Sequence, residues 1–179
     1  MIARLAVIAV LLLAACSSPG SPGESTGGST ESTGPGAGTG GGGLPSNLCD
    51  AVSEELAVAA LGGDVAEPSF GDVLPRPAGI YCHYALAADA NFNVETQLNE
   101  MTREDLEALA ARLLMDQPLS GVGEVAFQRA SSIMGLAGVS VAAWADGRGV
   151  TVSINASDGA DAAALLDAAS AIAEAALAS

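Results

Sequence analysis

The fold of this chain is decided by residues 80–98, which read IYCHYALAADANFNVETQL. Within them, residues 80–86 and 92–98 alternate apolar and polar side chains, which is typical of β-strands that bury one face. The link between the two segments is short enough for a hairpin. We therefore predict two neighbouring antiparallel strands with one face in the core. The side chains expected on that face are Ile80, Cys82, Tyr84, Leu86, Phe92, Val94, Thr96 and Leu98.

Helix start signals lie on both sides of this hairpin. Short polar side chains, which accept hydrogen bonds from free backbone N–H groups, precede three segments with apolar residues at helical spacing. The expected caps are Ser53, Thr102 with Asp105 in a variant capping box, and either Ser157 or Asp158. We expect the first helix to end at Gly62–Gly63 and the others near residues 116 and 178.

The remaining strands complete an antiparallel sheet. A weak edge strand is expected near Val65, and another strand at residues 125–130 follows a loop at 118–123. Residues 139–145 and 150–155 predict a second hairpin around turn residues that tolerate positive φ. The order α-β-β-β-α-β-β-β-α predicts an α+β fold, with about five to six antiparallel strands packed by helices.

The N-terminus carries a different pattern. Arg4 and the apolar run of residues 5–13 are typical of a secretory signal peptide, and the run is shorter than the ~20 residues that span a bilayer. It ends Leu13-Ala14-Ala15-Cys16, which resembles the lipobox of bacterial lipoproteins, where the cysteine receives a diacylglyceryl group and becomes the N-terminus. We expect residues 1–15 to be the leader and Cys16 to be lipidated. An ordinary cleaved signal with an incidental cysteine is the alternative.

The segment that follows predicts a disordered tether. Residues 17–47 contain 11 Gly, 7 Ser, 4 Thr and 4 Pro, too little apolar surface to offset the entropy of the chain. A coil of this kind spans roughly 30 Å, enough to hold a domain clear of the lipid head groups. We expect residues 16–47 to be the lipidated tether and 48–179 to form one globular domain.

The chain is strongly acidic, with a formal net charge of −15, and its sequence contains no lysine. Without lysine it has neither the phosphate-binding residue of a Walker A motif nor a Schiff-base amine. Its negative charge also repels nucleic acid, so we expect no nucleic-acid partner. The acidity favours solubility and repulsion from an anionic membrane surface, or docking of a basic partner.

Two cysteines remain besides Cys16. In an exported domain of this size, Cys49 and Cys82 most simply form a disulfide, which would close a loop of roughly 33 residues. A metal pair or a catalytic thiol is the alternative.

Catalytic motifs are scarce. His83 is the only histidine, and it points away from Cys82 because strand neighbours face opposite sides. The sequence has no G-x-S-x-G motif, which in hydrolases places a nucleophilic serine on a sharp turn. A metal site needs several ligands, and one histidine supplies only one of them. The carboxylate pairs Glu54-Glu55 and Glu104-Asp105 fall in first helical turns, where the helix dipole explains them. We expect no enzymatic activity, no cofactor and no metal.

The polar side chains of the predicted strands share the second face of the sheet. Tyr81, His83 and Trp144 are the candidate recognition residues there, since exposed aromatic side chains anchor many interfaces. Glu95, Gln97, Thr151, Ser153 and Asn155 accompany them. The alternative is an ordinary solvated face, or an interface with the first helix.

Two functions from different classes remain. The favoured one is a non-enzymatic binding or accessory module that contacts a protein or envelope component through this face. The second is a carrier of a small apolar ligand, held between the sheet and the alanine-rich last helix.

Several short motifs occur together in this chain: the lipobox, the low-complexity tether, Leu48-Cys49-Asp50, Cys82-His83-Tyr84, and GVGEVAF at residues 121–127. Together they resemble the domain of unknown function 3558, found in exported lipoproteins of high-G+C Gram-positive bacteria. The resemblance covers roughly residues 48–178. It implies a location on the extracytoplasmic face of the plasma membrane, a disulfide and an α+β domain, with a PsbP-like sandwich as the expected architecture. It implies no catalytic residues.

Overall fold

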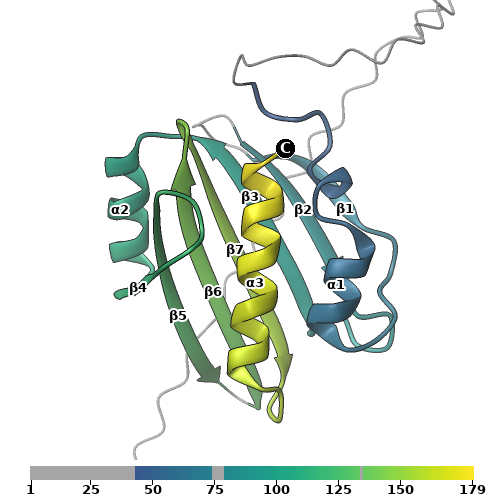
Figure 1. Ribbon diagram of the computed structural model, residues 1–179. Coiled ribbons are helices and arrows are strands. Elements are labelled where there is room, and N and C mark those ends of the chain that lie inside the picture. The colour runs from purple at the N-terminus through teal and green to yellow at the C-terminus, as the bar shows by residue number, and fades with distance from the viewer. Residues whose placement is uncertain (1–42, 74–78, 134) are drawn as a thin grey trace, which may run out of the picture. The chain divides into compact units, whose positions relative to one another are not determined.

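The predicted hairpin forms, and it belongs to a larger sheet than expected (Figure 1). In the computed structural model, which describes residues 43–73, 79–133 and 135–179, the strand order is β1-β2-β3-β7-β6-β5-β4. Every neighbouring pair is antiparallel. The α+β class is confirmed, with seven strands in place of five to six.

The elements follow one another without long gaps. The strands are β1 Ser69–Val73, β2 Gly79–Ala85, β3 Asn93–Glu100, β4 Gln117–Leu119, β5 Val125–Ile133, β6 Leu136–Ala145 and β7 Arg148–Ser157. The helices are the 3-10 turn η1 Leu48–Asp50, then α1 Glu54–Leu61, α2 Arg103–Arg112 and α3 Ala162–Leu177.

One face of the sheet carries the main core, and α1 and α3 lie against it (Figure 1). The pairs Ile80↔Leu98 and Tyr84↔Val94 place the alternating side chains of β2 and β3 on this face, where they are at most 8% exposed. Leu86 and Phe92, beyond the strand ends, are only half-buried. The helix α3 contributes Leu165, Ala169, Ile172, Ala173, Ala176 and Leu177. Burial of this apolar surface is the main stabilising term of the domain.

The opposite face of the sheet is covered only in part, by α2. A second apolar cluster there contains Leu106, Ala110 and Met115 packed on Ala142 of β6. Ala142 lies between Val141 and Ala143, which face the main core, so α2 and α3 lie on opposite faces. Among the described residues, this division leaves the strands β2 and β3 without a helix above their second face, while α2 reaches β7 at Gly149.

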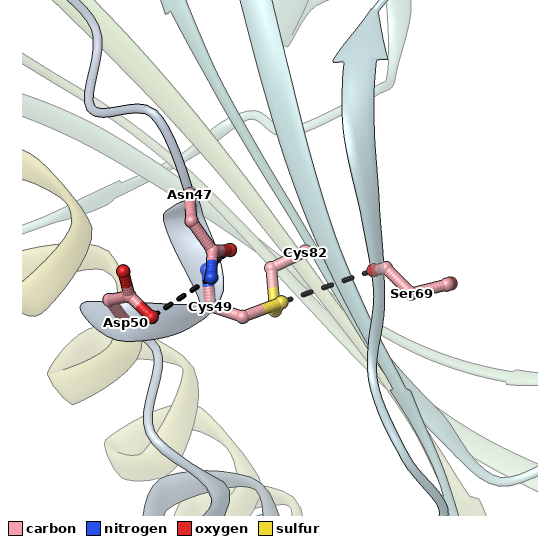
Figure 2. Close-up of a disulfide and its surroundings, with 5 residues drawn as sticks. All are labelled: Asn47, Cys49, Asp50, Ser69 and Cys82. Atoms are coloured by element: carbon pink, nitrogen blue, oxygen red, sulfur yellow. Dashed lines mark hydrogen bonds between the residues drawn. A yellow bond between two sulfur atoms is a disulfide. The ribbon is translucent and has the colours of Figure 1, made fainter. Parts of the chain in front are cut away.

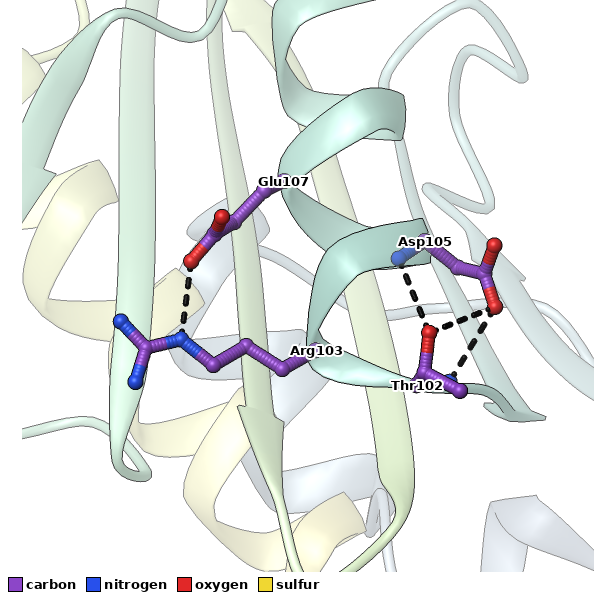
Figure 3. A network of polar contacts seen from close by, with 4 residues as sticks. All are labelled: Thr102, Arg103, Asp105 and Glu107. Carbon is purple, nitrogen blue, oxygen red and sulfur yellow. Dashed lines mark hydrogen bonds and ion pairs between the residues drawn. The ribbon is translucent and has the colours of Figure 1, made fainter.

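Two of the predicted helix caps are confirmed. The Ser53 side chain accepts a hydrogen bond from the Leu56 N–H, and α1 ends at Gly62 with φ 72°. At the start of α2, the Asp105 N–H donates to Thr102 Oγ1 at 3.1 Å, and the Thr102 N–H donates to the Asp105 carboxylate (Figure 3). These bonds satisfy N–H groups that have no partner inside the helix.

The predicted start of α3 is wrong. Its cap is Asp161 rather than Ser157 or Asp158, and the Asp161 carboxylate accepts the Ala163 N–H at 2.9 Å. The reason is that β7 runs on as far as Ser157, where it pairs with Leu136 of β6. The turn that leads to the helix therefore begins later than the cap signals indicate.

Two strand positions also need correction. The edge strand is β1, whereas Val65 makes only an isolated bridge with Leu86. The predicted loop at 118–123 contains most of β4, which pairs with β5 through Pro118↔Phe127. A proline fits at the edge of a sheet because its missing N–H can face away from the ladder. The helix α2 ends at Arg112, not near residue 116.

The second hairpin turns where the sequence predicts. Asp146 and Gly147 join β6 to β7, and their φ angles are 51° and 81°. Positive φ at both central residues is what a type I′ turn requires, and this turn matches the twist of the strands it joins.

Candidate functional site

A disulfide fixes the start of the domain to the sheet. Cys49 in η1 and Cys82 in β2 are joined by an S–S bond of 2.04 Å, with their Cα atoms 5.2 Å apart (Figure 2). The predicted disulfide is confirmed, and neither sulfur is free to act as a nucleophile or metal ligand. Asn47 holds the turn, since its carboxamide oxygen accepts the Cys49 N–H and its nitrogen donates to Asp50.

Polar side chains lie on the second face of the sheet, next to the part that α2 covers. The strand register places His83, Glu95 and Ser153 in one row across β2, β3 and β7. Tyr81, Gln97 and Thr151 form the next row. Two of the three candidate recognition residues, Tyr81 and His83, are therefore neighbours on this face.

This face has two depressions, and both are lined by Glu95 and Gln97. The first has a volume of about 360 Å³ and is lined by Ser69, Asp72, Val73, Tyr81, His83, Glu95 and Gln97. The second has a volume of about 270 Å³ and is lined by Glu95, Gln97, Leu109, Leu113, Met115, Thr151 and Ser153. We call the two together the groove. It crosses the strands from β1 to the side of α2.

The ring of Tyr81 lies across the backbone of Gly71 in β1. A Cβ atom at position 71 would lie 3.2 Å from the Tyr81 Cε1 atom and 3.5 Å from its hydroxyl oxygen. The glycine therefore leaves room for the ring to lie along the sheet. In this orientation Tyr81 presents an aromatic surface at the β1 end of the groove.

Glu95 is the central charged side chain of the groove. It is exposed, and its Oε1 atom accepts a hydrogen bond of 2.6 Å from Gln97 Nε2. No Lys or Arg occurs among the described residues that line the two depressions. Arg129 lies in β5 beyond the groove, and its guanidinium donates to the Leu113 carbonyl at the end of α2. That bond helps to hold the apolar wall in place.

Trp144 is on the same face but does not line the groove. Its indole N–H donates to the Met101 carbonyl at 2.9 Å, and its ring packs against the cluster under α2. The prediction that Trp144 shares a face with Tyr81 and His83 is confirmed, but Trp144 packs beside α2 instead of lining the groove. Asn155 is engaged elsewhere, donating to Asn93 at 3.1 Å.

The apolar wall of the groove was not predicted. Leu109, Leu113 and Met115 line it, and Leu113 is 41% exposed. The sequence signal is the helical spacing of Leu106, Leu109, Leu113 and Leu114, which predicts a buried stripe along the helix. The stripe divides between Leu106, which is buried, and two leucines that border the groove.

The remaining features add no further chemistry to the groove. Within the described ranges, no group of three or more His, Cys, Asp or Glu side chains could hold a metal ion. Burial raises the pKa of the Tyr84 hydroxyl, with smaller contributions from Glu54 and Asp50, but Tyr84 lies on the core face.

The predicted lipidation site, Cys16, lies outside the described residues. None of the helices described is long and apolar enough to cross a membrane.

The region proposed for an apolar ligand, between the sheet and α3, is occupied by side chains of the main core. The inward residues of α3 are at most 8% exposed, and four of the six are fully buried. A third depression, of about 390 Å³, lies elsewhere, where the ends of β5 and β6 meet the start of α3.

Comparisons with known proteins found no relative of this chain. No protein-family model, no curated protein and no solved structure matches the chain.

Proposed function

We propose that this chain is a lipid-anchored lipoprotein on the extracytoplasmic face of the plasma membrane. Its folded domain would be a non-enzymatic binding module that contacts a component of the cell envelope through the groove. The resemblance to the domain of unknown function 3558 belongs to the same proposal.

The sequence from Leu13 to Cys16 supports the anchor, and the composition of the following segment supports the tether. The disulfide between Cys49 and Cys82 supports an oxidising compartment, because such bonds persist mainly outside the cytoplasm.

The observation that carries the binding role is the groove itself. The second face of the sheet has two adjacent depressions, which share Glu95 and Gln97, and α2 supplies an apolar wall to the second one. An aromatic ring, a carboxylate and an exposed leucine side chain along neighbouring depressions are typical of a recognition surface.

Site-specific photo-crosslinking on intact cells tests this proposal. A photoreactive amino acid at Thr151, inside the groove, should give a defined adduct with an envelope component. The same amino acid at Ala171, on the exposed side of α3, serves as the matched control. The adduct should disappear when Tyr81→Ala is added. Equal adducts from both positions, or none from Thr151, would overturn the binding role of the groove.

A further inference from the structure

We infer that the groove binds an extended, positively charged peptide segment of a partner protein. A Lys or Arg side chain of the partner would lie between Tyr81 and Glu95, and an apolar side chain would contact Leu113 and Met115. This inference rests on the proposed binding role and specifies the chemistry of the partner.

Charge selects a cationic partner. Glu95 is exposed in the centre of the groove, and no Lys or Arg lines the described part of it. The formal charge of the chain is −15, so the long-range field also attracts cations. An anionic ligand would find no side-chain cation among these lining residues to pair with.

The β1 end of the groove suits a guanidinium or ammonium group. The Tyr81 ring lies along the sheet over Gly71. Gln97 is paired with Tyr81 across the strands, and its Nε2 atom donates the 2.6 Å hydrogen bond to the Glu95 carboxylate. A cation above an aromatic face gains about 0.5–1 kcal/mol at an exposed site. The nearby carboxylate adds a charge-assisted hydrogen bond.

The opposite end suits an apolar side chain. Leu109, Leu113 and Met115 form a wall beside Thr151 and Ser153. Leu113 is 41% exposed. An exposed leucine side chain gains free energy when a partner covers it.

The dimensions of the groove favour an extended peptide over a compact ligand. Neither depression is closed, whereas pockets for small molecules enclose most of the ligand surface. Tyr81 is in β2 and α2 packs on β6, which is three strands away in the sheet. Three spacings of about 4.8 Å give roughly 14 Å, which an extended chain covers in about four residues. Side chains four residues apart also point to the same side of an extended peptide.

Binding of synthetic peptides to the full chain in a non-ionic detergent tests the inference. The probes are fluorescent Gly/Ser peptides with one arginine and one leucine, placed two, four or six residues apart. Anisotropy should show the tightest binding for the spacing of four. A peptide with glutamate in place of the arginine should bind at least about tenfold more weakly, since charge complementarity is lost.

Matched variants locate the site. Glu95→Gln should weaken binding about tenfold, whereas Glu174→Gln removes the same charge from α3 and should change it less than about twofold. Tyr81→Phe should bind as the parent does and Tyr81→Ala should not, because the ring face is what the cation contacts. Circular dichroism establishes that each variant is folded.

Three outcomes would overturn the inference: equal losses for Glu95→Gln and Glu174→Gln, equal binding of the arginine and glutamate peptides, or no binding by any peptide. If these occur while the photo-crosslink from Thr151 persists, the groove binds a partner of different chemistry. If the crosslink is also missing, the proposed function fails as well.

Discussion

Thr96 places a hydroxyl group in the apolar centre of the domain. Its side chain is fully buried, and its row neighbours across the strands are Cys82 and Val152. Thr96 Oγ1 has no hydrogen-bond partner in the described part of the chain. A buried hydroxyl without a partner loses its hydration and gains no compensating bond.

Thr96→Val should therefore raise the free energy of unfolding by about 1 kcal/mol. Urea unfolding followed by circular dichroism measures this change. Thr151→Val, on the half-buried groove face of the neighbouring strand, is the control and should have little effect. A loss of stability in Thr96→Val would mean that the hydroxyl has a partner in solution.

Tyr84 makes the stability of the domain dependent on pH in the alkaline range. Burial raises the pKa of its hydroxyl, and the negative charges of Glu54 and Asp50 add to the effect. As the pH rises through about 10, the unfolded chain loses the tyrosine proton before the folded chain does. The unfolded state then binds fewer protons, so stability falls as the pH rises.

Tyr84→Phe should flatten this alkaline loss of stability, because phenylalanine has no proton to release. Thermal unfolding between about pH 8 and pH 11 measures the slope. The absence of lysine from the sequence leaves few other groups that titrate there. Equal slopes for Tyr84→Phe and the parent would contradict the assignment.

At the scale of elements, α2 is the part whose position matters most for the groove. It packs on Gly149 of β7, where a Cβ atom would collide with the Met101 side chain and lie 3.2 Å from Leu106 Cδ1. Trp144 holds the same end through its bond to the Met101 carbonyl. The wall of the groove depends on this close approach of helix and sheet.

Gly149→Ala should displace the start of α2 and lower the free energy of unfolding by about 1–2 kcal/mol. Trp144 is the only tryptophan in the chain, so the tryptophan fluorescence reports on this residue alone. Its emission should shift to longer wavelength because the indole becomes more exposed to water. Gly159→Ala is the matched control, because a Cβ atom there meets nothing within 4 Å. An unchanged spectrum in Gly149→Ala would show that α2 packs without needing this glycine.

Local signals in the sequence predicted most of the elements. Alternation predicted β2 and β3, Thr102 and Asp105 predicted the start of α2, and the turn residues Asp146–Gly147 predicted the second hairpin. The sequence did not show which face of the sheet α2 would cover, because that depends on contacts between distant segments. For the same reason it grouped Trp144 with Tyr81 and missed the apolar wall at Leu113.

At the scale of the whole molecule, the packed domain begins a few residues before the predicted end of the tether at residue 47, because Leu44 packs against the main core. The turn η1 starts at Leu48, and the disulfide from Cys49 to Cys82 joins it covalently to the second strand of the sheet. Tension along the chain would therefore reach β2 through a covalent bond rather than through η1 alone. Such a connection suits a domain that is held at one end.

The anchor itself is tested at Cys16, the residue on which the proposed location depends. Cys16→Ala should move the protein from the membrane fraction of cells to the soluble or secreted fraction, because one thiol carries the proposed diacylglyceryl group. The chain has a formal net charge of −15 and is repelled by an anionic membrane surface, so loss of the lipid should leave little retention. Cys49→Ala with Cys82→Ala removes the two other cysteines of the sequence and should leave the protein membrane-bound. Mass spectrometry of the parent should show an N-terminal lipidated cysteine, and an intact leader or equal retention of Cys16→Ala would contradict the anchor.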